Sequence, residues 1–168
     1  MHPTKNTLSQ KIRVESVDLL QDRLSNGIDL NLRVKHAHWN VKGDSFIALH
    51  KLFDEIHDSS EEWVDLMAER ILQLGGTAIG TVRASATRTK MPDYPMNASG
   101  GSLHIEAVAE TLARFGEMIR IASDETDRMG DRTTSDIFTE ISRSIDKYLW
   151  MVEAHQQLGQ SQRATNVA

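Results

Sequence analysis

Four polar side chains on one predicted helix have the types and spacing that metal chemistry needs: His50, Asp54, Asp65 and Glu69. Imidazole nitrogens and carboxylate oxygens are common metal ligands. At about 100° per residue, the four side chains fall within about 100° of one another, and the apolar residues of the same stretch lie on the other side of the helix. The stripe therefore faces away from the core against which its own helix packs.

One helix cannot close a metal site from this stripe. Asp54 and Asp65 are about 16 Å apart along the helix axis, whereas a metal ligand lies about 2 Å from its ion. The pair His50 and Glu69 and the pair Asp54 and Asp65 nevertheless share one midpoint. A second, antiparallel copy of the helix across a two-fold axis at that midpoint would bring each His50 end to the Asp65 end of its partner.

The stripe has two interpretations. In the first, two identical sites form per dimer, about an axis near Ser59 and Ser60 in height. In the second, these side chains are a solvated charged face with ordinary ion pairs at i,i+4 spacing. The shared midpoint favours the first interpretation without proving it.

The composition restricts the possible ligands and partners. The chain has 168 residues, no cysteine, 7 histidines and 24 acidic residues, so any metal must be held by His, Asp and Glu. Its length suits one domain, residues 1–168, with short flexible tails at about 1–7 and 159–168. The net charge of −5 argues against a general nucleic-acid surface, and we expect a cytoplasmic protein because no apolar run suggests a membrane span or a secretory signal.

Helical periodicity covers most of the first half of the chain. Apolar residues recur at helical spacing from Leu8 to about Ala37, and the segment from His38 to Gly43 interrupts them as a turn. Asp44 or Ser45 can cap a second helix that runs to Leu74 before two glycines. This second helix carries the stripe.

The second half of the chain contains a long connection and two more helices. Residues 75–101 hold five of the ten glycines and two of the three prolines, with a short helix at about 81–87. A third helix is expected at about 102–123, an acidic turn at 124–131, and a fourth helix from 132 or 133 to 158. Four long helices without a strand signal predict an all-α four-helix bundle with a short helix in the crossover between the second and third helices.

Ferritin-type bundles often hold a di-iron site inside the bundle, with Glu three residues before His on each of two helices. No histidine of this chain has Glu three positions before it. An intrabundle di-iron centre is therefore not supported. The stripe points instead to a site between subunits.

The segment HAHWNVKGDSFIALHKLFDEIHDSSEEWVDLMAERILQLGG, from His36 to Gly76, resembles the signature of the Dps family, the bacterial miniferritins. Similar segments of that family fall at Gly80–Thr81, at Tyr94–Pro95 and from Ser142 to Trp150, so the resemblance covers nearly the whole chain. It implies a ferritin-like four-helix bundle with a short crossover helix. It also implies two-fold dimers that assemble into a hollow shell of twelve subunits.

The resemblance implies an activity as well. Members of the family are ferroxidases that oxidise Fe(II), preferably with hydrogen peroxide, store ferric mineral in the shell and so protect against oxidative stress. Residue by residue, the catalytic iron ligands map to His38, His50 and Asp54 of one subunit and to Asp65 and Glu69 of its two-fold partner. A carboxylate-rich site with open positions suits iron (Fe2+/Fe3+), although zinc or cobalt would compete for the same ligands.

Residues around the stripe have simpler explanations than catalysis. His36, two residues before His38, should point elsewhere. Trp39 would take up a stray oxidising equivalent if the resemblance holds, but an aromatic residue at a helix end more often packs, and we expect no required role. For His57, Asp58 and Glu61 a polar dimer interface is the preferred role. Secondary iron binding or mineral nucleation by Asp58, Glu61 or Glu62 is the weaker alternative.

Ferrous ions need a route into a closed shell, and acidic residues at a symmetry axis would attract them by focusing the electric field. The candidates are Asp124, Glu125, Asp127, Asp131 and Asp136. Helix capping and solvation around a turn are an equally weighted explanation of these residues, especially of Asp131.

Candidate DNA contacts are few. The N-terminal tail offers Lys5, Lys11 and Arg13, and the C-terminal tail only Arg163. Twelve copies could add weak contacts together, but the shell would carry twelve times the charge of −5, which repels DNA. We expect DNA binding to be weak or absent. The alternative functions are a nucleoid-compacting protein with secondary iron chemistry and a structural bundle without metal.

Overall fold

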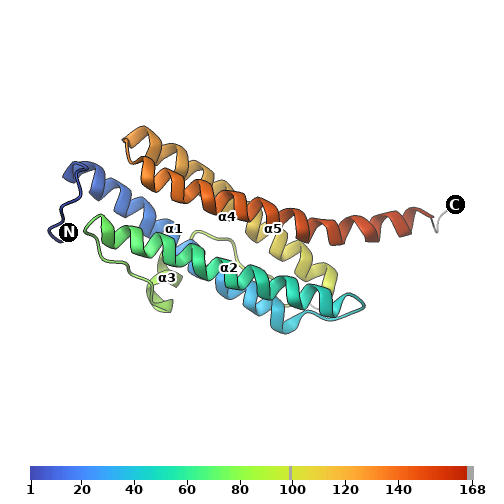
Figure 1. Cartoon of the computed structure of the whole chain (residues 1–168). Helices are drawn as coiled ribbons and strands as arrows, with labels where there is room; N and C mark the ends of the chain where they lie inside the picture. Colours follow the sequence, from blue (N-terminus) through green and yellow to red (C-terminus); the bar gives the residue numbers. More distant parts are fainter. Residues whose placement is uncertain (99, 166–168) are drawn as a thin grey trace.

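The computed structural model describes residues 1–98 and 100–165, with side chains described as far as residue 156. These residues form five α-helices and no strand (Figure 1). The helices are α1 (Gln10–Asn40), α2 (Phe46–Gln73), α3 (Val82–Arg88), α4 (Gly101–Met129) and α5 (Arg132–Thr165). The predicted all-α bundle with a short helix in the crossover is confirmed.

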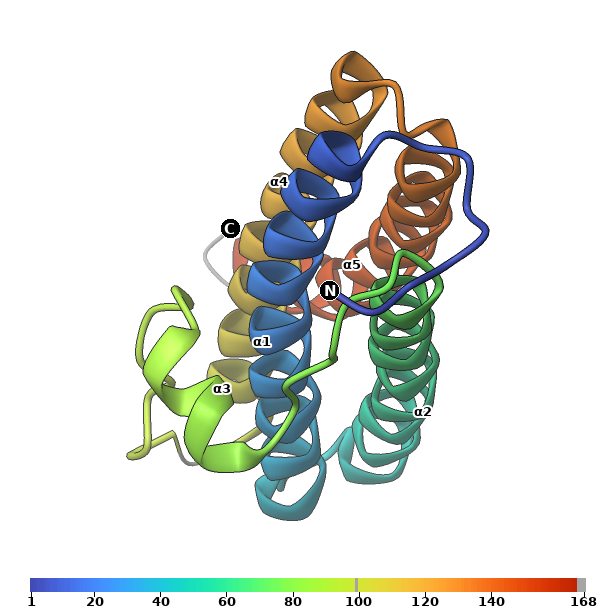
Figure 2. The same cartoon turned by 90° about the vertical axis from the view of Figure 1, so that its left-hand side faces the viewer.

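The four long helices pack as two hairpins placed side by side. α1 packs along α2 and α4 packs along α5, while α1 also contacts α4 and α2 also contacts α5. Figure 2, which looks roughly along the bundle, shows this square arrangement with α3 outside it, against α1. The outer face of α2, which carries the stripe, is therefore not covered by another long helix of the same chain.

The core lies between the four long helices and consists of the apolar side chains that their periodicity predicts. Leu20 and Leu24 of α1, Phe53 of α2, Phe115 of α4 and Phe138 of α5 are fully buried. Burial of side chains of this size stabilises the bundle by about 1.5–3 kcal/mol each. The bundle thus holds its two hairpins together through a continuous apolar interior.

The helices α1 and α4 both continue beyond their predicted ends, and each difference has a local cause. α1 continues to Asn40, so His38 lies in its last turn and not in the predicted connection, because Val41 N–H still donates to Ala37. The predicted acidic turn at 124–131 is wrong, because residues 124–129 are helical and buried Thr126 donates to Ala122. Gly130, at φ +90°, ends α4 instead.

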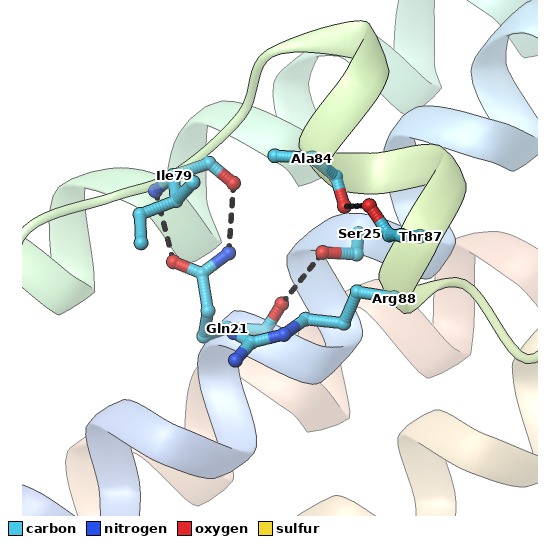
Figure 3. A pocket seen from close by; sticks show the side chains of 6 residues that line it. All are labelled: Gln21, Ser25, Ile79, Ala84, Thr87 and Arg88. Carbon is cyan, nitrogen blue, oxygen red and sulfur yellow. Dashed lines mark hydrogen bonds between the residues drawn. The ribbon is translucent and has the colours of Figure 1, made fainter.

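The crossover from α2 to α4 is fixed to α1 by side-chain hydrogen bonds. The Gln21 amide accepts from the backbone N–H of Ile79 and donates to the carbonyl of the same residue, at 2.9 Å each (Figure 3). Further along, Asn26 accepts from the backbone N–H of Lys90, and Arg33 donates to the carbonyl of Pro92. These contacts determine where α3 and the following segment lie.

The N-terminal segment, residues 1–9, crosses the end of the bundle from the start of α1 to the end of α2 (Figure 2). The His2 backbone N–H donates to the carbonyl of Gly75, and the His2 ring lies 3.2 Å from Thr77 Oγ1. Gly75 has φ +87°, and a Cβ atom at this position would lie 2.6 Å from the His2 carbonyl oxygen. Glycine is therefore required where the two segments meet.

At the other end of the chain, α5 continues to Thr165, beyond the predicted end at Leu158. The stretch contains no proline, and a single glycine, Gly159, does not stop a helix that lacks other breakers. Residues 166–168 of the predicted tail lie outside the described residues. Among the helices that the structure describes, none has the length and apolar character needed to cross a membrane.

Candidate metal centre

The turn between α1 and α2 brings His38 and His50 together. Their rings stack with centroids 3.7 Å apart and planes 23° apart. His38 Nδ1 lies 2.8 Å from the carbonyl oxygen of His50, and His50 Nδ1 lies 2.9 Å from the carbonyl oxygen of His38. The two residues thus hold each other through a reciprocal pair of hydrogen bonds.

These bonds fix the tautomer of both rings. A carbonyl oxygen only accepts hydrogen bonds, so each Nδ1 must carry the hydrogen and donate. In a neutral imidazole the lone pair is then on Nε2, which is the arrangement that metal-binding histidines show when a carbonyl orients them. The Nε2 atoms of both rings therefore carry lone pairs that are chemically able to bind a metal ion.

Asp54 lies one turn after His50 on α2 and adds a carboxylate to the pair. Its Oδ1 is 3.6 Å from His38 Nδ1, and its side chain is 45% exposed. The pKa of Asp54 is lowered, first by the hydrogen bond from Lys35 and then by the charges of His38, Lys35 and His57, although burial opposes this effect. The carboxylate is therefore ionised at neutral pH and available to a cation.

The sequence interpretation missed Lys35. Its Nζ lies 2.6 Å from Asp54 Oδ1, so the ammonium occupies a position beside the carboxylate that a metal would use. Lys35 is three residues before His38 on α1, which places both side chains on one face of that helix. This spacing was the available signal, but it becomes informative only once α1 and α2 are known to be paired.

Asp65 and Glu69 lie further along α2, on its exposed face. Neither carboxylate forms an ion pair among the described residues. Over the same part of the chain, no group of three or more His, Asp or Glu side chains is close enough to hold a metal ion. Within one chain, His38, His50 and Asp54 therefore lie together without forming a metal site, and no contact among the described residues brings Asp65 or Glu69 to them.

A groove beside the middle of the stripe is formed by α1, α2 and α3. Its cavity has a volume of about 600 Å³, and its lining includes Ile28, Asn31 and Leu32 of α1, Val82 of α3 and the acidic residues Asp58, Glu61, Glu62 and Asp65 of α2. His57 is adjacent, with Nε2 3.8 Å from Glu61 Oε1. The polar residues near the proposed axis are thus exposed or half-buried on the surface that a second copy would cover.

His36 and Trp39 lie outside the ligand cluster. The His36 ring turns toward the crossover, where its centroid is 5.3 Å from that of Tyr94. Trp39 is 66% exposed, so it does not pack within its own chain. The expectation that an aromatic residue at this helix end is buried does not hold for the single subunit.

The acidic candidates for an iron route separate into two groups. Asp131 is 1% exposed, so its charge does not lie on the surface. Its carboxylate accepts hydrogen bonds from the Arg70 guanidinium at 2.7 Å and from the backbone N–H of Thr134 at 3.1 Å. It is the N-terminal cap of α5. The remaining candidates lie on the exposed or half-buried surface of α4 and α5 near this turn: Asp124, Glu125, Asp127 and Asp136.

The basic residues near the N-terminus also differ from one another. Arg13 donates to the backbone carbonyls of Leu8 and Leu74, so its guanidinium helps to hold the N-terminal segment. Lys11 is exposed and pairs weakly with Glu15 at 3.9 Å, and Lys5 is exposed. Few basic groups are therefore free for a polyanion at this end of the chain, and Arg163 lies beyond the side chains that the structure describes.

Comparison with protein families and curated relatives agrees with this architecture. The profile of the ferritin-like domain matches residues 17–161. The chain is 43% identical over 156 residues to the DNA protection during starvation protein of Agrobacterium fabrum, covering 93% of this chain and 96% of that relative. It is 30% identical over 153 residues to the protein of the same name from Brevibacillus brevis, covering 89% and 97%.

Solved structures give the same result. Mycobacterium smegmatis Dps in its tetragonal form superposes with a TM-score of 0.86 at 31% identity, covering 91% of this chain and 93% of that one. DpsA14 from Streptomyces coelicolor superposes with a TM-score of 0.86 at 32% identity, covering 90% of each chain. Both the sequence and the arrangement of helices are therefore shared along nearly the whole length.

Proposed function

Because this chain belongs to the Dps family of ferritin-like proteins, we propose that it is a ferroxidase that oxidises Fe(II) and stores the ferric product in a hollow shell. The observation that carries the proposal is the reciprocal bonding of His38 and His50, which leaves a lone pair on each Nε2, together with the ionised Asp54, whose Oδ1 lies 3.6 Å from His38 Nδ1. The partner subunit's Asp65 and the partner subunit's Glu69 complete the site across a two-fold axis. Iron is the substrate, and hydrogen peroxide is the preferred oxidant.

The chemistry follows from the ligand set. Neutral imidazoles and carboxylates bind Fe(II) at moderate affinity and stabilise Fe(III) through their negative charge. The incomplete set within one chain, together with the midpoint of the stripe, supports a site shared between two copies. Twelve subunits would enclose the mineral, and acidic residues near the start of α5, such as Asp127 and Asp136, would attract ferrous ions.

Protection of DNA appears in the names of the curated relatives. For this chain we propose that such protection arises from removal of Fe(II) and peroxide in the cytoplasm, and not from a DNA surface. The net charge of −5 and the structural use of Arg13 support this choice. Compaction of the nucleoid is the alternative function, and it requires that Lys5 and Lys11 of the assembled subunits are sufficient to bind DNA.

A subunit-mixing experiment tests the shared site. His50→Ala and Asp65→Ala shells should each lose rapid peroxide-driven iron oxidation, because each lesion damages every site. In a mixed two-fold pair, one site carries both lesions and the other carries neither. Random pairing should therefore restore about a quarter of the wild-type activity.

Glu153→Ala, at an exposed carboxylate of α5, is the matched control and should behave as wild type. Far-UV circular dichroism of each variant shows whether the helices are retained. Mixed shells no more active than the single variants, despite retained helices, would show that the two halves do not meet in one site.

A further inference from the structure

The proposed metal centre does not use a hydrogen-bonded pair beside α1, which consists of the half-buried Tyr94 and the buried His104. The side chain of His104, near the start of α4, is fully buried, and its Nδ1 lies 2.8 Å from the Tyr94 hydroxyl oxygen. Its Nε2 has no hydrogen-bond partner among the described residues. The phenol of Tyr94 is therefore the sole polar contact that the structure describes for this imidazole.

Both groups are neutral at neutral pH. Burial raises the pKa of Tyr94 to about 12, although Arg33 opposes this effect. Burial, and then the charge of His36, lowers the pKa of His104. A neutral imidazole is a base, and it lies within hydrogen-bond distance of a phenol that stays protonated.

Such a pair is suited to one-electron chemistry. A phenol that loses an electron becomes a strong acid and must release its proton. A hydrogen-bonded base takes that proton in the same step, so the half-buried phenol never has to carry a positive charge, which burial would penalise. In the tautomer whose hydrogen lies on Nε2, His104 Nδ1 accepts the hydrogen bond from the Tyr94 hydroxyl and is in the position to take this proton.

The pair contacts the last turns of α1, the helix that also carries His38. His36 is two residues before His38 on α1, and its ring meets the Tyr94 ring edge-on, with planes at 75°. A surface cavity lined by His36, Arg33, Asp93 and Tyr94 opens beside the phenol. Tyr94 therefore lies beside the end of α1 that carries His38.

We propose that Tyr94 and His104 form a redox-active pair that quenches one-electron oxidants made at the iron site. When peroxide meets a single Fe(II), it gives Fe(III), hydroxide and a hydroxyl radical. Tyr94 gives one electron to the radical, which becomes hydroxide, while the phenolic proton moves from Oη to His104 Nδ1. A second Fe(II) then reduces the tyrosyl radical and becomes Fe(III), and Nδ1 returns the proton.

Electrons and protons balance over these reaction steps, because one peroxide takes two electrons from two Fe(II) ions and ends as two hydroxides. The physiological oxidant rests on the proposed function, but the redox property of the pair does not. The chain's other tyrosine, Tyr148, is bonded to the hydroxyl of Ser59 at 2.7 Å, which is a much weaker base than imidazole. Trp39 is exposed.

Metal-free protein allows a test that is independent of ferroxidase activity. Photo-generated tris(bipyridine)ruthenium(III) removes one electron from the protein, and electron paramagnetic resonance identifies which kind of side chain carries the resulting radical. Wild type and the matched control Tyr148→Phe should give a tyrosyl signal that Tyr94→Phe loses. Formation of the signal should slow in D2O for wild type, and His104→Gln should lose this isotope effect.

A tyrosyl signal of wild-type size in Tyr94→Phe, or a signal confined to tryptophan in wild type, would overturn the assignment. With iron, spin trapping at less than one Fe(II) per site should detect more hydroxyl radical from Tyr94→Phe than from Tyr148→Phe. If wild type oxidises no iron at all while the metal-free result holds, the proposed function fails and the redox pair stands.

Discussion

Arg70 of α2 and Asp131 at the start of α5 form a buried ion pair, with Nη2 to Oδ1 at 2.7 Å. The side chains are 6% and 1% exposed, and Thr134 completes the network through its hydroxyl and its backbone N–H. Burial would raise the pKa of Asp131, but the bonds from Thr134 and the charge of Arg70 hold it below its usual range. One carboxylate thus caps α5 and ties it to α2.

Removal of this carboxylate should destabilise the protein strongly. Asp131→Ala leaves the Arg70 guanidinium buried without its partner and α5 without its cap, at a cost of about 3–5 kcal/mol. Asp127→Ala, at an exposed carboxylate 3.9 Å from Arg132, should cost less than about 1 kcal/mol. Chemical denaturation measures both, and equal losses would show that the cap contributes little.

Lys35 should compete with metal at Asp54. In Lys35→Met the ammonium no longer occupies the position beside Oδ1, and the pKa of Asp54 should return toward its ordinary value. Because the pair is partly exposed, we expect a gain of about 1 kcal/mol, or roughly fivefold in Kd, for a divalent cation such as Co(II). Lys51→Met is the control on the exposed surface of α2, and calorimetric titration measures both.

The buried His104 should make stability depend on pH. Its pKa is lowered by burial and by His36, so the unfolded chain binds more protons than the folded chain once the pH falls below the ordinary value of 6.5. The stability that neutral His104 provides is present above that pH and is lost as the pH falls. His104→Gln should flatten this dependence below pH 6.5.

His155→Gln, at a half-buried histidine of α5, is the control for this pH dependence. Thermal unfolding followed by circular dichroism across the pH range gives the comparison. An unchanged slope in His104→Gln would show that His104 does not cause the acid sensitivity.

Gly75 should be indispensable for docking of the N-terminal segment. Gly75→Ala meets two costs, a side chain at positive φ, worth about 1–2 kcal/mol, and a clash with the His2 carbonyl at 2.6 Å. Gly43→Ala, at φ +108° with no atom within 4 Å, carries only the first cost. Limited proteolysis should therefore cut within residues 1–9 faster in Gly75→Ala than in Gly43→Ala, and equal rates would mean that the clash is relieved.

DNA binding should be weak at physiological salt. Double substitution Lys5→Ala with Lys11→Ala should remove any mobility shift seen at low salt, because phosphate contacts give a steep salt dependence. Arg13 is left in place, since it holds the N-terminal segment. Tight binding at physiological salt that survives the double substitution would indicate a polyanion surface elsewhere on the chain.

Periodicity was sufficient for most of the fold. The ends of α2, at Phe46 and Gln73, fall within one or two residues of the predicted ends because Ser45 and the two following glycines mark them. The end of α4 was misjudged because its exposed acidic residues resemble a turn, while the informative residue is Thr126, which is buried. A polar helix end is distinguished from a loop only by what its other face contacts.

For the candidate site, the sequence predicted the residues on α2 but not their contacts with α1. The stripe on α2 follows from helix geometry, since all four residues belong to one element. Contacts between elements do not follow in this way. Lys35 beside Asp54 and the mutual bonding of His38 and His50 depend on how α1 lies against α2, which the spacing of residues within each helix does not determine.

The reciprocal hydrogen bonds of His38 and His50 also depend on the register between α1 and α2. A slide of α1 along α2 by one turn would break both bonds together and separate the rings. Any ion that binds both Nε2 atoms would then report, through its affinity, on a sliding motion too small to expose the core. Metal affinity measured in mild denaturant could therefore reveal loosening of this hairpin before the bundle unfolds.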